Sequence, residues 1–543
     1  MRDWLSHRAD ATPGAEALVV ASSGETLTYA DLDARAEALA ERLVGLGVVR
    51  GDHLAVVCSN RPEYAALVHA AMRLGARLVP CSDRLTAAEL APRLDAADAT
   101  TVVCEAGTEA LVVAATGDAS GEGDGAGVAG DGDAGDADPR PVTTVSLDEP
   151  TNGHVAAIEA APVGDVPAVR REREDPLLML FTSGTTGEPK LVPLTTGNVL
   201  ASATASAFRL GVLPDDRYLA TLSLHHTGGI MPIYRATLYG TSVVLREGFD
   251  AGDAVDDVRE YDATGVSLVP TMLRRMLDAR GTLPSSLRTV LLGGAPASDA
   301  LIERCRNFSV PVHPTWGMTE AASQLATARP DEAFERVGTV GRPLLWTDVR
   351  VVDEDGTELP PGETGELVVS GPAVAGGYYD DPAATDAAFT DDGALRTGDA
   401  GYRDEDGYVY VLNRLDDRIL TGGENVDPGE VATAIREHPA VDDAAVVGLP
   451  DPEWGERVAA LVVPSDPGLT AEALESSCRE RLAGFKLPRT VAFADELPRT
   501  VSGTVGRPAV REALDDAADA ADAAAPDIDA GVGDGAGGAT DDG

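Results

Sequence analysis

Lysine is almost absent from this sequence: Lys190 and Lys486 are its only two lysines, and its other basic residues are arginines. Lysine and arginine together number 43 against 90 acidic residues, which gives a net charge of −47. Such a surface repels nucleic acid and anionic lipid. The charge balance is typical of adaptation to high salt, where the Debye length falls to about 3 Å at 1 M. Because arginine occupies almost every basic position, a lysine that remains indicates chemistry that arginine does not perform.

Paired cysteines and long apolar runs are also missing. The five cysteines, Cys58, Cys81, Cys104, Cys305 and Cys478, are scattered and form no Cys-x-x-Cys motif. This argues against a disulfide framework and a zinc site, so we expect five reduced, structural thiols. No apolar run approaches the ~18 residues that a membrane span needs, and the N-terminus lacks a secretory apolar region. We therefore expect a cytoplasmic protein that does not insert into membranes.

Apolar residues make up 44% of the chain, and they are arranged in alternating strand-like and helix-like segments. Short apolar runs separated by amphipathic stretches predict an α/β fold with parallel sheets. The segments that carry this prediction are residues 53–58, 62–74, 78–80, 177–181, 242–245, 266–269 and 289–292.

Changes in composition divide the chain into parts. From residue 363 the pattern becomes alternating strand with turns, which predicts a β-rich subdomain, and a fresh βα-like run follows the charged segment near Asp416. We predict a large domain over residues 1–415 and a small, mobile α+β domain over 416–514. Residues 116–139 and 515–543 are rich in Gly, Asp and Ala, and we predict that they form a disordered acidic insertion and a disordered acidic tail.

The strongest local motif follows the apolar segment 177–181. It reads Thr182-Ser183-Gly184-Thr185-Thr186-Gly187-Glu188-Pro189-Lys190. Glycines let backbone N–H groups approach phosphate oxygens, hydroxyls add donors, and Lys190 adds a point charge. The spacing differs from that of a Walker A loop. The motif predicts a nucleotide phosphate site.

This motif and those below resemble the adenylate-forming superfamily of acyl-CoA synthetases, luciferases and nonribosomal peptide adenylation domains. The resemblance covers residues 27–511, and its signatures occur in the family's order. It implies a large adenylate-forming domain with a small C-terminal domain. It also implies ATP with Mg²⁺, an acid and coenzyme A as the small-molecule partners. The oligomeric state, a homo-oligomer included, stays open.

The resemblance also implies the nucleotide contacts. The turn Gly293-Gly294-Ala295-Pro296 would pack against adenine. Trp316, where the family has tyrosine, would stack on the adenine ring. Thr319 would contact the α-phosphate and Glu320 would bind Mg²⁺, which favours carboxylate and phosphate oxygens.

A second group of family positions falls near the predicted domain boundary. Asp399, in Thr397-Gly398-Asp399, would accept the ribose hydroxyls, and Arg414 matches the ribose and hinge arginine. Asp416 falls at the pivot, and Gly422-Gly423-Glu424 matches the loop that lines the pantetheine tunnel.

The acyl substrate is indicated by a closer resemblance within the superfamily. Residues 317–324 resemble the corresponding segment of the o-succinylbenzoate–CoA ligases of menaquinone biosynthesis. His226 matches the family's pocket histidine, and Thr271, Ser323 and Gln324 are further acyl-pocket candidates, although the last two could instead pack behind the nucleotide. A medium-chain or aryl acyl-CoA synthetase is the alternative enzyme.

One departure opens a different alternative. Thr504 stands where the family has a lysine that reaches the acyl carboxylate and α-phosphate. A unit charge at 4 Å in a partly shielded site is worth up to about 4 kcal/mol, or about a thousandfold in rate. Arg507 or Arg499 could take over this role, whereas Lys486 matches a structural segment. If none does, the chain is a catalytically silent nucleotide- or acyl-binding homologue.

Overall fold

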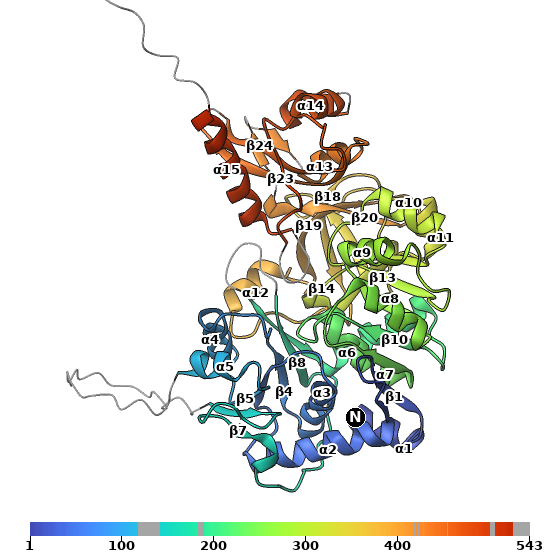
Figure 1. Ribbon diagram of the computed structural model, residues 1–543, viewed down its shortest axis with the longest axis vertical. Helices are drawn as coiled ribbons and strands as arrows, with labels where there is room; N and C mark the ends of the chain where they lie inside the picture. Colours follow the sequence, from blue (N-terminus) through green and yellow to red (C-terminus); the bar gives the residue numbers. More distant parts are fainter. Residues whose placement is uncertain are drawn as a thin grey trace, which may run out of the picture. The chain divides into compact units, whose positions relative to one another are not determined.

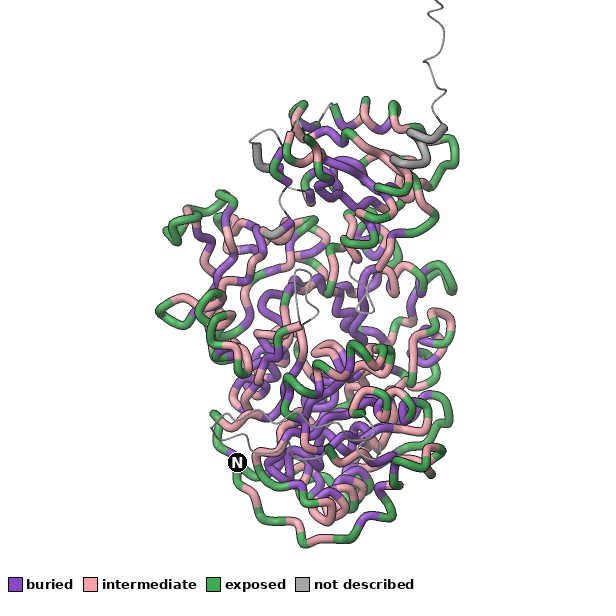
Figure 2. Tube along the Cα trace, turned by 90° about the vertical axis from the view of Figure 1, so that its left-hand side faces the viewer, coloured by how far each residue is buried: buried purple, intermediate pink, exposed green. Residues whose placement is uncertain are grey.

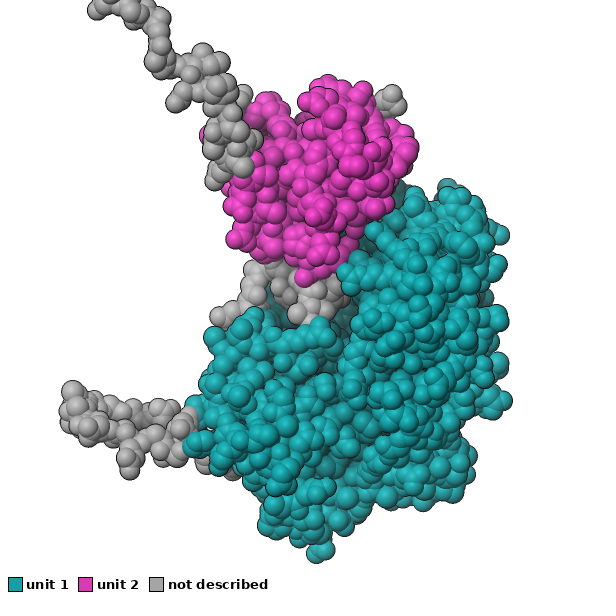
Figure 3. Space-filling view, viewed as in Figure 1, with its two compact units in different colours: residues 1–416, 501–504 teal, residues 417–500, 505–543 magenta. Residues whose placement is uncertain are grey.

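The computed structural model describes residues 1–117, 142–182, 189–417, 419–421, 424–426, 428–452, 454–479, 481–499 and 505–524 (Figure 1). Only the backbone is described at residues 416, 424, 425 and 518–524. Contacts between residues divide the chain into two compact units, one formed by residues 1–416 and the other by the described residues from 417 on (Figure 3). No described helix is both long enough and apolar enough to cross a membrane.

A seven-stranded sheet in the first unit has the order β7-β6-β5-β3-β4-β8-β9. All its neighbouring strands pair in parallel except β8 and β9, which form a hairpin. Its strands are β3 (His53–Val57), β4 (Arg77–Pro80), β5 (Thr101–Cys104), β6 (Thr143–Ser146), β7 (Ala156–Ala157), β8 (Pro176–Phe181) and β9 (Leu191–Thr195). Helices α3 (Pro62–Leu74), α4 (Ala87–Ala96), α5 (Glu109–Thr116) and η1 (Ile158–Ala160) connect them.

A nine-stranded sheet has the order β16-β15-β14-β13-β12-β10-β11-β1-β2 and is parallel from β14 to β1. Its strands are β1 (Glu16–Val20), β2 (Thr26–Thr28), β10 (Arg217–Ala220), β11 (Ser242–Leu245), β12 (Gly265–Leu268), β13 (Thr289–Leu292), β14 (Val312–Met318), β15 (Ser323–Thr327) and β16 (Arg342–Pro343). The accompanying helices are α1 (Trp4–Ala11), α2 (Tyr29–Gly45), α6 (Thr196–Leu210), α7 (Thr227–Tyr239), α8 (Ala251–Glu260), α9 (Pro270–Arg280), α10 (Asp299–Asn307), η2 (Thr319–Ala321) and α11 (Pro330–Glu335).

One core joins the two sheets. A single apolar cluster contains Leu54 of β3, Leu67 of α3, Met231 of α7 and Val243 of β11, so α3 and α7 lie between the sheets. Every residue of α3 from Tyr64 on is buried. In Figure 2 the buried stretches of the trace lie inside the molecule and the exposed stretches run around its outside. The predicted parallel α/β architecture is confirmed, and its predicted strands lie within one residue of the observed ones.

The β-rich part of the first unit is a four-stranded antiparallel sheet of order β17-β18-β19-β20. Its elements are β17 (Asp348–Val352), β18 (Gly365–Ser370), α12 (Pro382–Ala388), β19 (Leu395–Arg403), β20 (Val409–Arg414) and η3 (Leu415–Asp417), the last of which reaches one residue beyond the first unit. This sheet matters for the site because the β19–β20 register places Asp399 opposite Arg414.

The second unit has α+β architecture. Strands β23 and β24 pair along most of their length, β21 pairs with β22 and β24, and β25 adds a parallel strand beside β24. The elements are β21 (Ile419–Thr421), β22 (Glu424–Val426), α13 (Pro428–Arg436), β23 (Val441–Asp451), β24 (Gly455–Pro464), α14 (Ala471–Arg479), η4 (Gly484–Lys486), β25 (Thr490–Phe493) and α15 (Arg507–Ala524). The functions assigned to residues 1–415 and 416–514 stay predictions.

The last helix corrects the predicted start of the acidic tail. We expected disorder from residue 515, but α15 continues to Ala524. Val510 and Leu514 are buried against β23 and β24, and the following run is rich in alanine, the strongest helix former. The rest of the predicted tail, and the predicted insertion from residue 118 on, lie outside the described residues.

Candidate active site

The predicted adenine turn and the predicted phosphate and metal residues follow neighbouring strands. Gly293 comes directly after β13, and Thr319 and Glu320 come directly after β14, which pairs in parallel with β13. Parallel neighbours end at the same sheet edge, the usual place for a ligand site in such sheets. A Cβ on Gly293 would lie 2.7 Å from Cγ2 of Thr315, so the turn packs closely beside β14. Gly294 (φ +77°), Ala295 and Pro296 continue this turn.

The segment that carries Glu320 folds back as a tight hairpin onto β15. A Cβ on Gly317 would lie 1.8 Å from the carbonyl oxygen of Ser323, so this close approach requires glycine. The hairpin places Ser323 opposite Met318 and Gln324 opposite Gly317. Gln324 is buried, and its Nε2 donates to the hydroxyl of Thr327 at 2.8 Å. Its Oε1 has no hydrogen-bond partner in the described part of the chain.

Asp399, Arg414 and Trp316 form one hydrogen-bonded group. The indole N–H of Trp316 donates to Oδ2 of Asp399 at 2.8 Å, and Nη1 of Arg414 donates to Oδ1 at 3.1 Å. Arg414 also donates to the carbonyl of Thr397 at 3.0 Å. Burial raises the pKa of Asp399, and Arg414 and Trp316 oppose that rise in part. Each carboxylate oxygen keeps a second lone pair, so the group can accept two further hydroxyl hydrogen bonds.

Glu320 and Lys190 are joined by a residue that the sequence analysis did not select, Tyr378. The hydroxyl of Tyr378 donates to Oε1 of Glu320 at 2.8 Å, and Nζ of Lys190 lies 4.7 Å from the centroid of its ring. Burial raises the pKa of Tyr378, the charge of Glu320 raises it further, and Arg414 lowers it. The charge of Glu320 also contributes to the raised pKa of Asp399, so both groups share one electrostatic environment.

The ends of the predicted phosphate loop are held together by two hydrogen bonds. The N–H of Thr182 donates to the carbonyl of Lys190 at 2.8 Å, and the N–H of Lys190 donates to the hydroxyl of Thr182 at 3.1 Å. These two hydrogen bonds extend the β8–β9 hairpin and fix the backbone position of Lys190. Five predicted phosphate contacts, Ser183, Gly184, Thr185, Thr186 and Gly187, lie outside the described residues.

The predicted acyl side contains two neighbouring buried histidines. His226 lies at the N-terminus of α7, with its ring centroid 4.2 Å from that of His225. Burial lowers the pKa of His226, and burial, His226 and Arg84 together lower that of His225 to about 3. Both rings are therefore neutral near pH 7. Nε2 of His226 is buried without a partner among the described residues, and Thr271 is half-buried in the first turn of α9.

A second residue that the sequence analysis missed is Arg235, on α7. It is 7% exposed, yet neither Nε nor Nη2 has a hydrogen-bond partner within the described residues. It lines a cavity of about 50 Å³ together with Tyr218 and Tyr239, and the Tyr218 hydroxyl is hydrogen-bonded to Ser267 at 2.7 Å. Arg235 comes nine residues after His226, about 13 Å further along the helix. Thr241, Thr264 and Thr289 also line this cavity and lie at the amino ends of β11, β12 and β13, so it sits at the opposite sheet edge from Gly293 and Thr319.

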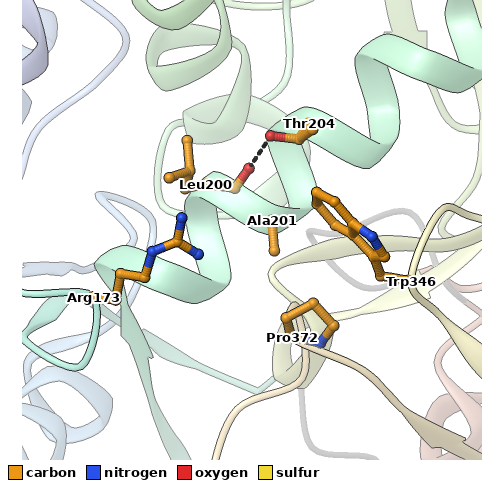
Figure 4. A pocket seen from close by; sticks show the side chains of 6 residues that line it. All are labelled: Arg173, Leu200, Ala201, Thr204, Trp346 and Pro372. Carbon is orange, nitrogen blue, oxygen red and sulfur yellow. Dashed lines mark hydrogen bonds between the residues drawn. The ribbon is translucent and has the colours of Figure 1, made fainter.

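A larger surface cavity, of about 340 Å³, lies beside α6 (Figure 4). Its lining is mostly apolar and includes Trp346, which is 56% exposed. The hydroxyl of Thr204 is already bonded to the carbonyl of Leu200 at 2.8 Å, and Arg173 is exposed. The lining residues are Arg173, Leu200, Ala201, Thr204, Trp346 and Pro372, none of which is a predicted site residue. This cavity offers no acid, base or nucleophile, so we assign it no catalytic role.

Comparison with known proteins decides the family. The AMP-binding enzyme family matches residues 5–379, and the AMP-binding enzyme C-terminal domain matches residues 430–504. The chain belongs to the AMP-binding enzyme family.

Relatives of this AMP-binding enzyme include the 2-succinylbenzoate–CoA ligase of Bacillus licheniformis, which is 35% identical over 93% of this chain and 98% of its own. The o-succinylbenzoate CoA synthetase of Bacillus subtilis has been solved with its acyl-adenylate intermediate (TM-score 0.81, 32% identity, 94% of this chain and 98% of that chain). It has also been solved with ATP and magnesium ion (TM-score 0.82, 32% identity, 95% of this chain and 99% of that chain).

The remaining predictions for the AMP-binding enzyme concern the hinge and its second unit. Asp416 lies in η3 and Glu424 begins β22, both with only the backbone described, whereas Gly422, Gly423 and Thr504 lie outside the described residues.

The basic residues considered as replacements for the family lysine are all ion-paired within the second unit. Arg499 pairs with Asp443 (2.8 Å), Arg507 with Asp417, and Lys486 with Glu430 (2.6 Å). An arginine that replaces the family lysine would first have to leave its carboxylate.

Proposed function

We propose that this AMP-binding enzyme is an ATP-dependent 2-succinylbenzoate–CoA ligase that acts through an acyl-adenylate and serves menaquinone biosynthesis. The observation that carries the proposal is the joint placement of Asp399, Arg414, Glu320, Tyr378 and Lys190 in one electrostatic environment in the first unit. The names of its relatives support the same substrate.

In the first half-reaction, a carboxylate oxygen of the acid attacks the α-phosphorus of ATP, and pyrophosphate leaves. We assign Asp399 and Arg414 to the ribose, Trp316 and the turn 293–296 to adenine, and Thr319 to the α-phosphate. Lys190 and residues 182–187 stabilise the charge of the departing pyrophosphate. His226 orients the reacting carboxylate as a neutral hydrogen-bonding group, as its burial requires.

Mg²⁺ fits the chemistry of the residues present. Glu320 uses Oε1 to accept the hydrogen bond from Tyr378, and Oε2 accepts no hydrogen bond from the described residues. A magnesium ion bound by one carboxylate oxygen and substrate phosphates is the arrangement that this ion prefers. When bound there, Mg²⁺ neutralises charge on the phosphates.

In the second half-reaction, the CoA thiol loses its proton, its sulfur attacks the acyl carbon of the mixed anhydride, and AMP leaves. The thioester is the product, and no protein residue forms a covalent bond. We place Asp416 at the pivot between the half-reactions and Gly422, Gly423 and Glu424 beside pantetheine, following the family resemblance.

2-Succinylbenzoate carries one carboxylate that reacts and one that does not, so its pocket needs polar groups as well as an apolar surface. We assign Thr271, Ser323 and Gln324 to the acyl pocket beside His226. Nε2 of His226 is buried without a partner among the described residues and is a polar atom that a ligand can satisfy. A medium-chain or aryl acid is the alternative substrate.

High salt is the working environment that we propose for the enzyme. The support is the net charge of −47, which screening by salt renders tolerable in a compact protein. Melting temperature measured against KCl concentration tests this: it should rise steeply with KCl, and a flat or falling profile would contradict the proposal.

A coupled assay for AMP release tests the function. Wild-type protein and a Thr504→Lys variant are supplied with ATP, Mg²⁺, CoA and 2-succinylbenzoate, with benzoate and octanoate in parallel. Turnover of 2-succinylbenzoate alone is expected. Turnover of benzoate or octanoate instead would overturn the substrate, and AMP release only by the Thr504→Lys variant would identify a silent homologue.

A further inference from the structure

Tyr378 occupies a loop that is fixed at several points. Its own N–H donates to the hydroxyl of Thr385 at 2.9 Å, at the start of α12. Earlier in the loop, the N–H of Ala375 donates to the carbonyl of Glu320 at 2.7 Å. The side-chain amide of Asn198 also donates to two loop carbonyls, those of residues 372 and 374, at 3.0 and 2.9 Å. The backbone of this loop is therefore tied directly to the segment that carries Glu320.

The tyrosine side chain meets two opposite charges with two different parts. Its hydroxyl donates to the carboxylate of Glu320, and its ring face lies beneath the ammonium group of Lys190. A cation over an aromatic face is attracted by the negative π-face, whereas the hydroxyl stabilises a carboxylate. One side chain thus contacts both a carboxylate and an ammonium group.

We infer that Tyr378 is a positioning residue that orients Glu320 for the metal and Lys190 for the phosphates. This inference rests on the proposed function of the same site. The hydrogen bond restricts Glu320 to an orientation in which Oε2 faces away from the tyrosine. The ring holds Lys190 weakly enough that a phosphate, a stronger partner for an ammonium group, can draw it away.

A purely structural role is the competing explanation, because the ring also packs edge-on against Phe389 at a centroid distance of 6.3 Å. Tyr378→Phe separates the two explanations, since it keeps the ring and removes only the hydroxyl. The neighbouring Tyr379 supplies a matched control. Its hydroxyl also donates to a carboxylate, that of Asp98, at 2.8 Å, but on an exposed part of the surface.

The first measurement is calorimetric binding of ATP with and without Mg²⁺, which requires no acid substrate. For Tyr378→Phe we expect affinity for Mg²⁺·ATP to fall about tenfold, because a hydrogen bond to a charged group is lost. Affinity for metal-free ATP should change less than twofold, and Tyr379→Phe should match wild type in both. Equal Mg²⁺·ATP affinity for Tyr378→Phe and wild type would overturn the inference.

A double-mutant cycle identifies the group through which Tyr378 acts. In a Glu320→Gln background, the further change Tyr378→Phe should leave Mg²⁺·ATP affinity within twofold of the single variant. A second tenfold loss in that background would show that Tyr378 acts elsewhere and would contradict the inference.

Steady-state kinetics then separates this inference from the proposed function. Tyr378→Phe should lower kcat/KM for ATP about tenfold and leave KM for the acid and for CoA within twofold. If wild type turns over no acid but the calorimetric difference is present, the proposed function fails and the positioning role stands. If wild type is active and Tyr378→Phe shows unchanged binding and kinetics, the proposed function stands and the positioning role of Tyr378 fails.

Discussion

The nucleotide side and the acyl side of the candidate site differ in how their polar groups are satisfied. On the nucleotide side, Asp399 is bonded to Trp316 and Arg414, and Glu320 is bonded to Tyr378. On the predicted acyl side, buried polar atoms of two residues have no partner among the described residues. They are Nε2 of His226 and Oε1 of Gln324.

This difference follows from what each side has to bind. Ribose and phosphates offer many hydroxyls and oxygens, and groups already fixed by protein hydrogen bonds can contact them through spare lone pairs and donors. The unpartnered atoms of His226 and Gln324, which we assign to the acyl pocket, are buried, and a buried polar atom without a partner destabilises the folded protein. These two side chains should therefore be stabilised most when a polar ligand binds.

Asp399→Asn should impair ATP binding and use more than any other substitution considered. It removes the charge that is bonded to Arg414 and that we assign to the ribose hydroxyls, so kcat/KM for ATP should fall about 100-fold, with KM for the acid little changed. Because burial raises the pKa of Asp399, the neutral amide should not destabilise the fold. Kinetics and thermal melting check both parts, and a parallel loss of melting temperature would indicate a structural role instead.

Lys190→Arg should lower kcat by about tenfold or more, because a planar guanidinium does not reproduce a compact ammonium group between a tyrosine ring and a phosphate. The matched control is Lys486→Arg at the only other lysine, which pairs with Glu430. That variant should match wild type in the AMP-release assay. Equal activity of both variants would show that the retained lysine is not needed as such.

Arg235→Met should show, away from the predicted site, what an unpartnered buried polar group does to stability. Replacing an unpaired buried charge by an apolar side chain of similar length should raise the free energy of unfolding of the ligand-free protein by about 1–3 kcal/mol. Denaturant unfolding measures this change, and Arg306→Met, which removes the partner of Glu303 in an exposed ion pair, provides the control. A less stable Arg235→Met variant would show that the guanidinium already has a partner within the folded protein.

Acid should weaken the fold through the acyl-side histidines. The folded-state pKa of His225 is about 3, below its usual value of 6.5, so between these values only the unfolded chain binds the proton. The free energy of unfolding should therefore fall, by about 1.4 kcal/mol per pH unit for this residue, as the pH drops from 6.5 toward 3. His225→Asn should reduce that slope, and His7→Gln, at an exposed position, should not; equal slopes in all three proteins would refute this assignment.

The parts that could be predicted from the sequence were those with a local signal. Apolar strand-like runs between helix-like segments predicted the parallel sheets, and paired glycines after such a run marked the turn at residues 293–296. Tyr378 was missed because its role depends on a contact with Glu320, which is 58 residues away in the sequence. The predicted tail began too early because burial of Leu514 and alanine propensity outweighed the polar composition.

The central claim is that this AMP-binding enzyme is a ligase for 2-succinylbenzoate. The most direct test compares kcat/KM for 2-succinylbenzoate with that for two analogues that each keep one carboxylate, benzoylpropanoate and 2-butanoylbenzoate. We predict that the enzyme prefers the dicarboxylate over the better analogue by about a thousandfold. Equal kcat/KM for the dicarboxylate and the better analogue would contradict the account.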